Sequence, residues 1–307
     1  MSTRVAVVDI GSNSTRLLIA DLEGERVEDE LERRSTVTRL GAGVDSDGRL
    51  SEEAMNRVYD TVAQYGEQIE QCSAERRIAV LTSAVRDAAN GEQFAHTIAE
   101  RYGLEPHILA GEEEARLTFL GAMSERDPGD ATPTLVVDIG GGSTEFVIGS
   151  GHSPSFHVST QAGVVRQTER HIEHDPPEQP ELAELAADVR ETISAGVPRA
   201  HRRAVEHAIA VAGTATSLGA IAQSVEPYDP EKVQGYMLSR REIRGILNRL
   251  ASVPLEQRRE TPGLHPDRAP TIIAGVVILE EVLELFGLER VEVSEHDILR
   301  GAALALS

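Results

Sequence analysis

Val5-Ala-Val-Val-Asp9-Ile10, Gly11-Ser12-Asn13-Ser14 and Thr15-Arg16-Leu17-Leu18-Ile19-Ala20 form the continuous stretch that decides the fold of this chain. Two apolar runs rich in β-branched residues flank a turn of small residues, which is the pattern of a β-hairpin. The pattern recurs as Leu135-Val-Val-Asp138-Ile139, Gly140-Gly141-Gly142-Ser143 and Thr144-Glu145-Phe146-Val147-Ile148-Gly149. Aspartate, isoleucine, glycine, serine and threonine occupy matching positions in both copies. This ordered match indicates an internal duplication, with one copy opening each half of the chain.

The segment between the two copies, Arg126 to Pro133, is polar and contains two prolines, as a connection between domains often does. We therefore expect two related domains, residues 1–125 and 126–307, each long enough to bury its own core. Strands alternate with helices in both halves, which favours α/β domains with a mixed or largely parallel sheet. Expected helices cover residues 51–71, 91–102, 112–123, 181–195 and a stretch from 213, with others centred near 246, 257 and 277 and one at the end; further strands are expected at 77–83, 106–110, 207–212 and 290–294.

The two turns are candidate phosphate-binding loops. Glycine allows backbone N–H groups to converge on an anion, and serine and threonine hydroxyls add donors. An aspartate, Asp9 or Asp138, precedes each turn, so two turns facing each other across a cleft could hold a phosphoryl group and its metal ion. Either turn taken alone is explained adequately as the connection of a β-hairpin. The occurrence of two matching turns favours the interpretation that they bind phosphate. No Gly-Lys-Ser/Thr motif is present, and both turns lead into strands, which excludes a Walker loop and a Rossmann site.

The acidic run Glu112-Glu113-Glu114 opens an expected helix. The helix dipole favours carboxylates in the first turn, which explains Glu112 and Glu113 adequately. For Glu114 we favour a functional role, because the run follows the end of a strand, where clefts in open sheets form. Composition alone does not choose among the three carboxylates.

Composition narrows the class of function. The formal net charge is -21 and Lys232 is the only lysine among 30 basic residues, which argues against binding nucleic acid or an anionic membrane non-specifically. The longest apolar stretch, Ile272 to Leu279, is far shorter than the roughly 20 residues that span a bilayer, and no leader-like segment opens the chain. Cys72 stands alone, which fits a reducing compartment. We expect a cytoplasmic, halophilic protein with an acidic surface adapted to high salt.

Five short motifs occur in a specific order: Asp9-Ile-Gly-Ser-Asn-Ser14, Ser83-Ala-Val-Arg86-Asp-Ala88, Gly111-Glu-Glu-Glu-Ala-Arg-Leu117, Asp138-Ile-Gly-Gly-Gly-Ser-Thr-Glu145 and Ala212-Gly-Thr-Ala-Thr216. Together they resemble the exopolyphosphatase and guanosine pentaphosphate phosphohydrolase (Ppx/GppA) family, in its short form without a C-terminal helical domain. The resemblance continues through Arg39-Leu-Gly-Ala-Gly43, Gly163-Val-Val-Arg166 and Gly263-Leu-His-Pro-Asp-Arg268-Ala269, and so covers nearly the whole chain. The chain departs from the family pattern at Gln234, at Pro270, and over Glu295-His-Asp-Ile-Leu-Arg300, which replaces a Gly-Leu-Arg tail.

The resemblance implies a duplicated actin-like α/β fold of the acetate and sugar kinase, Hsp70 and actin type, with a cleft between its two domains. It also implies hydrolysis of terminal phosphate, with inorganic polyphosphate or guanosine pentaphosphate (pppGpp) as substrate, and it is compatible with a homodimer. Glu114 would be the general base and Glu145 a second catalytic carboxylate, while Asp9, Asp138 and Glu145 would hold Mg²⁺ or Mn²⁺. The expected phosphate-binding residues are Ser12, Asn13, Ser14, Arg86, Gly140, Gly141, Gly142, Ser143, Thr144, Gly213 and Thr214, with Arg16 and Arg268 extending the set.

Two other classes of protein share the implied fold. A sugar or acetate kinase would transfer phosphate from ATP to a carbon substrate, but Glu114 and the tight Gly213-Thr-Ala-Thr216 loop argue against it. A filament or binding protein that hydrolyses nucleotide would not explain why Arg86 and Glu114 occur in these motifs. An alternative explanation for Arg86 is a surface ion pair with Asp87. Among substrates we favour polyphosphate, because the chain has no tryptophan and few aromatics to stack on a guanine.

Overall fold

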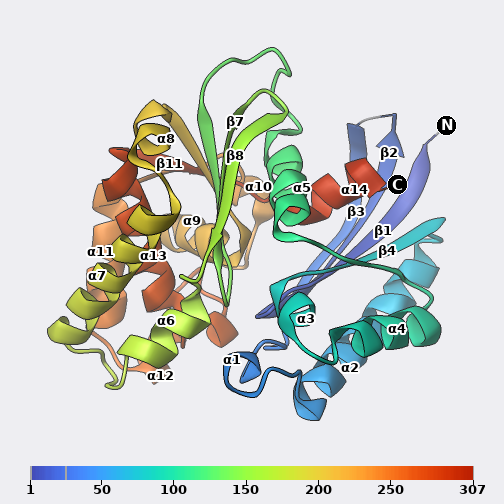
Figure 1. The fold of residues 1–307 in the computed structure, drawn as a ribbon, viewed down its shortest axis with the longest axis horizontal. Helices are drawn as coiled ribbons and strands as arrows, with labels where there is room; N and C mark the ends of the chain where they lie inside the picture. Colours follow the sequence, from blue (N-terminus) through green and yellow to red (C-terminus); the bar gives the residue numbers. More distant parts are fainter. Residues whose placement is uncertain (1, 25, 307) are drawn as a thin grey trace. The chain divides into compact units, whose positions relative to one another are not determined.

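The computed structural model describes residues 2–24 and 26–306. The chain forms two compact units: unit 1 comprises Met1–Ser124 and His296–Ser307, and unit 2 comprises Glu125–Glu295. Each unit contains one β-sheet with helices packed on it (Figure 1). None of the described helices is long and apolar enough to cross a lipid bilayer.

The sheet of unit 1 has five strands in the order β3-β2-β1-β4-β5. The elements are β1 (Thr3–Ile10), β2 (Ser14–Glu23), β3 (Arg26–Val37), β4 (Arg76–Leu81) and β5 (Glu105–Ile108), with helices α1 (Val44–Asp47), α2 (Glu52–Gln71), α3 (Ser83–Asp87), α4 (Gly91–Tyr102), α5 (Gly111–Met123) and α14 (Ile298–Leu306). The first three strands pair antiparallel, whereas β4 lies parallel to both β1 and β5.

The two faces of this sheet bury different helices, because successive side chains of a strand point to opposite faces. Ala6 and Val8 of β1 belong to a core shared with α2 and α4, while Val5 and Val7 belong to a core shared with α5 and α14. All four side chains are fully buried. The strand therefore reads as continuously apolar, as expected for one covered on both faces.

The sheet of unit 2 has six strands in the order β10-β11-β9-β6-β7-β8. The strands are β6 (Thr134–Ile139), β7 (Thr144–Ser150), β8 (Ser153–Thr160), β9 (His207–Val211), β10 (Met237–Ser239) and β11 (Arg290–Val293). The helices are α6 (Val164–His171), α7 (Gln179–Gly196), α8 (Arg199–Ala204), α9 (Ala212–Gln223), α10 (Pro230–Val233), α11 (Arg240–Ala251), α12 (Leu255–Arg258) and α13 (Ile272–Phe286), with a 3₁₀ turn, η1, at Pro266–Arg268. One continuous apolar core joins this sheet to α7, α9, α11 and α13.

The two sheets repeat one topology. The order β3-β2-β1-β4-β5 in unit 1 corresponds to β8-β7-β6-β9-β11 in unit 2, where β10 is an additional antiparallel edge strand. The two turns also match, because the N–H of Gly11 donates to the Ser14 carbonyl and the N–H of Gly140 to the Ser143 carbonyl, both at 3.0 Å. The duplicated, actin-like α/β fold is thus confirmed.

Most expected elements appear close to their expected bounds, whereas the edge strands β3 and β8 are not expected from the sequence. The charged sequence of β3, Arg-Val-Glu-Asp-Glu-Leu-Glu-Arg-Arg, gives no apolar alternation. Such charge on an edge strand protects its unpaired side from other chains. The stretch near residue 257 forms only one helical turn, α12.

The last helix, α14, packs in unit 1 against α5 and β1. From the sequence, residues 296–307 are expected to belong to the second domain, whereas they belong to compact unit 1. The chain first passes from unit 1 to unit 2 after Ser124, one residue before the expected boundary at residue 125. Apolar burial explains the packing, because Ile298, Leu299 and Ala302 join the core of one sheet face. Division of the chain into two related domains at 1–125 and 126–307 otherwise stays a prediction.

We expect Gly121→Ala to destabilise unit 1. A Cβ atom at Gly121 would lie 1.9 Å from the carbonyl oxygen of Asp297, where α5 and α14 approach backbone to backbone. Overpacking of this kind costs about 1–3 kcal/mol or more. The control is Gly66→Ala in α2, where a Cβ meets nothing within 4 Å and the better helix former should add about 0.5–1 kcal/mol. Urea unfolding measures the free energy of unfolding of both variants. A Gly121→Ala variant as stable as wild type would contradict the described packing.

Candidate functional site

The turn between β1 and β2 in unit 1 is held from both sides. The carbonyl of Ser12 accepts from the N–H of Gly41 at 2.8 Å, and the carbonyl of Asn13 accepts from the N–H of Thr38 at 3.0 Å. The Ser12 hydroxyl is hydrogen-bonded to the Ser83 hydroxyl, 2.9 Å away at the start of α3. Since its carbonyls are bound, the turn is pre-organised before any ligand arrives.

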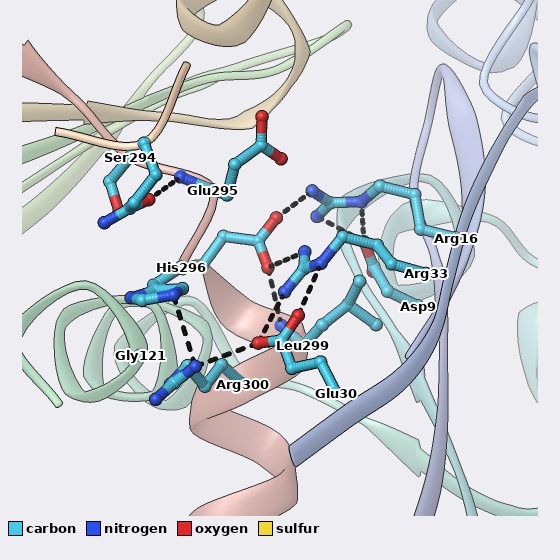
Figure 2. A network of polar contacts seen from close by, with 12 residues as sticks. Asp9, Arg16, Glu30, Arg33, Gly121, Ser294, Glu295, His296, Leu299 and Arg300 are labelled. Atoms are coloured by element: carbon cyan, nitrogen blue, oxygen red, sulfur yellow. Dashed lines mark hydrogen bonds and ion pairs between the residues drawn. The ribbon is translucent and has the colours of Figure 1, made fainter. Parts of the chain in front are cut away.

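Asp9 lies on β1 directly opposite Arg16 on β2. Its Oδ2 atom accepts from Arg16 Nε at 2.8 Å and from Nη2 at 2.5 Å, whereas its buried Oδ1 atom has no hydrogen-bond partner. Burial raises the pKa of the Asp9 carboxyl, and the Arg16 charge opposes the shift. Figure 2 shows Arg16 beside Asp9. Arg16 also donates to Asp297, so its guanidinium is engaged with two carboxylates, and its expected phosphate contact stays a prediction.

Glu114 is buried in the first turn of α5 and paired with Arg86 of α3. Arg86 Nη1 donates to Glu114 Oε2 and to the Leu109 carbonyl, each at 3.0 Å. Burial raises the pKa of Glu114 to about 7; the Arg86 hydrogen bond and charge oppose this shift, and the negative charge of Asp9 adds to it. A carboxylate with this pKa can both gain and lose a proton near neutral pH.

The geometry separates Glu114 from the two other carboxylates of the run. Glu112 is exposed, and Glu113 is bound by Arg116 at 2.8 and 3.0 Å one turn later in the same helix. Glu114 is only 9% exposed and faces a cation from another element. Arg86 also lies 3.4 Å from Asp87, so the alternative surface pair exists beside the buried one.

The matching turn of unit 2 is held by α6. The carbonyls of Gly140 and Gly141 accept from the N–H groups of Val164 and Val165, both at 2.9 Å, and Gly142 accepts from Arg166 Nε at 3.1 Å. A Cβ atom at Gly163 would lie 2.3 Å from the Gly141 carbonyl oxygen, so only glycine permits this approach. Arg166 therefore braces the turn; its only sequence signal is the Gly163-Val-Val-Arg166 motif.

Asp138 and Glu145 occupy the ladder positions that Asp9 and Arg16 occupy in unit 1. Two carboxylates thus lie directly opposite each other on one sheet face, where like charges repel. Glu145 is 5% exposed, and its Oε1 accepts from the Ser159 hydroxyl at 2.8 Å. Oxygen ligands of this kind fit Mg²⁺, which is usually bound by one or two carboxylates together with water and phosphate oxygens.

The described residues contain no group of three or more acidic, histidine or cysteine side chains arranged to hold a metal ion. The expected ligands are divided, since Asp9 belongs to unit 1 whereas Asp138 and Glu145 belong to unit 2. Within each unit the observations that fit a cation are therefore the unpartnered Oδ1 of Asp9 and the facing pair Asp138 and Glu145.

Helix α9 begins beside the turn of unit 2. The hydroxyl of Thr214 donates to the Ile139 carbonyl at 3.3 Å, and Arg268 Nη1 donates to the Gly213 carbonyl at 2.7 Å and to Ser217 Oγ at 3.0 Å. Helix N-termini favour anions, because their first N–H groups lack backbone partners. The structure thus brings Gly213, Thr214 and the 140–144 turn together, while Arg268 braces the helix start.

Gln234, one of the departures from the family pattern, has a local role in unit 2. Its Oε1 atom accepts from the N–H of Glu295 at 2.7 Å and from the Ser294 hydroxyl at 3.4 Å. The side chain therefore holds the segment that follows β11.

Comparison with known proteins relates most of the chain to one family. The model of the Ppx/GppA phosphatase family matches residues 24–303. Exopolyphosphatase 2 of Mycobacterium tuberculosis is 37% identical over 317 aligned residues, covering 99% of both chains. A crystal structure of the Aquifex aeolicus Ppx/GppA family member superposes with a TM-score of 0.84 at 30% identity, covering 100% of this chain and 98% of that one. An exopolyphosphatase from Cytophaga hutchinsonii gives 0.89 at 26% identity, covering 99% and 97%.

Proposed function

Because the chain belongs to the Ppx/GppA phosphatase family, we propose that it is an exopolyphosphatase that removes terminal phosphate from inorganic polyphosphate. The observation that carries this proposal is the buried Glu114, which Arg86 holds and whose pKa is about 7. Relatives named exopolyphosphatase align over nearly their whole length. Neither a kinase nor a filament protein accounts for a buried base beside an arginine.

In the proposed reaction, Glu114 accepts a proton from water as the water oxygen attacks the terminal phosphorus atom. The bridging P–O bond breaks, and its electron pair leaves with the shortened polyphosphate, so the products are inorganic phosphate and a chain one unit shorter. General-base catalysis of this kind contributes about 10²–10⁴-fold to a rate. Arg86 uses Nη1 to orient Glu114 and has its Nε beside Asp87, so we propose that its Nη2 donates to phosphate oxygens.

We propose that the two matching turns bind phosphate. They contribute Ser12, Asn13 and Ser14 in unit 1 and residues 140–144 in unit 2, with Gly213 and Thr214 at the start of α9. Their carbonyls are held by neighbouring elements, which leaves the turns as rigid sets of donors. Arg16 and Arg268 already donate to protein acceptors, so any contact with phosphate would use their remaining N–H groups.

We propose that Asp9, Asp138 and Glu145 hold Mg²⁺ or Mn²⁺, with Glu145 also serving the attacking water. Hard divalent cations prefer carboxylate and water oxygens, and these three side chains offer only oxygen. When bound, such an ion neutralises charge that develops on the phosphate oxygens. The support is the free oxygen of Asp9 and the facing carboxylates of unit 2.

The composition supports a cytoplasmic, salt-adapted enzyme as part of the proposal. A net charge of -21 should repel an anionic polymer at low salt. At about 1 M salt the Debye length falls to roughly 3 Å, so distant carboxylates no longer act on the substrate. Only the charges next to the bound phosphates would then matter.

Hydrolysis of guanosine pentaphosphate is the second candidate function, and Tyr228 is the observation that favours it. Its side chain is 48% exposed, and its hydroxyl is hydrogen-bonded to Glu295 within unit 2. An exposed ring of this kind can stack on a base. Arg268 lies near enough for its charge to act on the Tyr228 hydroxyl, which places the ring near the start of α9.

We expect Glu114→Gln to lower kcat for short polyphosphate by about 10²-fold or more, because the amide cannot accept the proton. Glu112→Gln, an exposed change two residues away, is the matched control and should lose little. Since Glu114 acts when ionised and its pKa is about 7, wild-type kcat/KM should rise with pH through that value. Wild-type turnover in the purified Glu114→Gln variant would show that another group is the base.

Removal of divalent metal should abolish hydrolysis, and Mg²⁺ or Mn²⁺ should restore it, because the proposed ligands are all oxygen atoms. Glu145→Gln should raise the Mg²⁺ concentration needed for half-maximal activity, whereas Glu112→Gln should not. The measurement is phosphate release after exhaustive chelation and then after Mg²⁺ or Mn²⁺ is added back at increasing concentration. Undiminished activity without metal would contradict the proposed ligands.

A side-by-side assay of short polyphosphate, long polyphosphate, guanosine pentaphosphate and ATP, at low and molar salt, decides the substrate. We expect polyphosphate to give the highest kcat/KM and low salt to reduce turnover, because surface carboxylates then repel the substrate. Tyr228→Ala separates the candidates, since only a base-binding enzyme should lose kcat/KM selectively for the nucleotide. A clear preference for guanosine pentaphosphate would replace the substrate but not the catalytic groups.

A further inference from the structure

A line of ion pairs in unit 1 starts at Asp9 and ends at α14 (Figure 2). Acidic and basic members alternate along it: Asp9, Arg16, Asp297, Arg33, Glu30 and Arg300. Arg33 Nη1 lies 3.7 Å from Asp297 Oδ1, and its Nε lies 3.1 Å from Glu30 Oε2. Arg300 Nη1 completes the line 2.9 Å from Glu30 Oε1. Each charge thus has opposite neighbours, as buried charges require.

Asp297 is the member that connects this line to the proposed site. It is 3% exposed and lies immediately before α14, where its Oδ1 accepts from the Leu299 N–H at 3.1 Å. That contact is a helix N-cap. Its Oδ2 accepts from Arg16 Nη1. The residue belongs to the segment Glu295-His-Asp-Ile-Leu-Arg300, which departs from the family pattern.

The packing of α14 does not require the ion pair between Asp297 and Arg16. Ile298 and Leu299 are buried in the core that α14 shares with α5 and the sheet. Gly301 approaches so closely that a Cβ atom there would lie 1.8 Å from the Leu117 carbonyl oxygen. Backbone contact and apolar burial therefore hold the helix, and the presence of a buried ion pair is weak evidence that the pair itself stabilises the fold, because desolvation offsets its attraction.

The ion pair has a direct consequence for Asp9. A guanidinium fork commonly binds both oxygens of one carboxylate. Here Arg16 directs Nε and Nη2 to the single Oδ2 atom of Asp9, while its Nη1 donates to Asp297. The Oδ1 atom of Asp9 is left buried and without a hydrogen-bond partner.

We propose that Asp297 is a positioning residue that holds Arg16 away from Oδ1 of Asp9 and so keeps this oxygen available to a divalent cation. The inference rests on the metal-dependent hydrolysis proposed above. Without the Asp297 charge, Arg16 loses the carboxylate that draws its Nη1 away from Asp9, and it turns to bind both oxygens of Asp9. The cation then competes with an arginine for the same atom.

Mn²⁺ binding to the protein without substrate, measured by electron paramagnetic resonance, tests the proposal. Asp297→Asn is the informative variant, because asparagine still caps the helix but lacks the charge that holds Arg16. We expect its Mn²⁺ affinity to fall about 10-fold or more, as for other residues that orient a metal ligand. Glu30→Gln is the matched control: it removes a carboxylate from the same line, but Asp297 and two arginines separate it from Asp9. Its Mn²⁺ affinity should stay at the wild-type value.

A second measurement establishes that Asp297 acts through Arg16. In an Arg16→Gln background, adding Asp297→Asn should cause no further loss of Mn²⁺ affinity, because residues that act on one path are not additive. Wild-type affinity in Asp297→Asn, an equal loss in Glu30→Gln, or independent losses in the double variant would each overturn the proposal. Thermal unfolding of each variant serves as the control that a loss of Mn²⁺ affinity does not reflect a loss of folded protein. A wild-type chain that binds Mn²⁺ but releases no phosphate would overturn the proposed function alone.

Discussion

Antiparallel pairing across a short turn sets residue 9 opposite residue 16 in unit 1 and residue 138 opposite residue 145 in unit 2. Residues directly opposite in such a pair point to the same face of the sheet with their Cβ atoms close together. The register therefore decides which charges meet at the end of each central strand. The same register places each small-residue turn next to this charged pair, at the end of the strands that the turn connects.

The two copies of the hairpin carry different charges at this ladder position. In unit 1 an arginine neutralises the aspartate, whereas in unit 2 a second carboxylate faces it. The backbone topology and the hydrogen bond that closes each turn are nevertheless the same. Duplication thus supplies two similar scaffolds with different electrostatics: one pairs an aspartate with an arginine that also binds Asp297, and the other places two carboxylates opposite each other.

Local burial governs the acid–base chemistry of this strongly acidic chain. Glu114 has its raised pKa because it is removed from water, and Arg86 limits that shift by a direct hydrogen bond. Most other carboxylates are exposed or paired with a neighbouring arginine, as Glu113 is with Arg116. Distant surface charges are screened by salt, whereas a buried pair is screened much less. The proposed general base is therefore insulated from the charge of the surface.

The sequence by itself determined the duplicated hairpins, most helix and strand positions and the candidate turns, because apolar periodicity and turn chemistry act over a few neighbouring residues. Composition alone did not choose Glu114 over Glu112; the position after a strand and the family resemblance favoured Glu114, and the structure adds that its side chain is the one buried against Arg86. Only the tertiary structure placed α14 in unit 1 and paired Asp297 with Arg16, 281 positions apart. No local pattern encodes such a pair: it arises when strands and helices distant in sequence bury their apolar faces together, and their polar ends must then find partners.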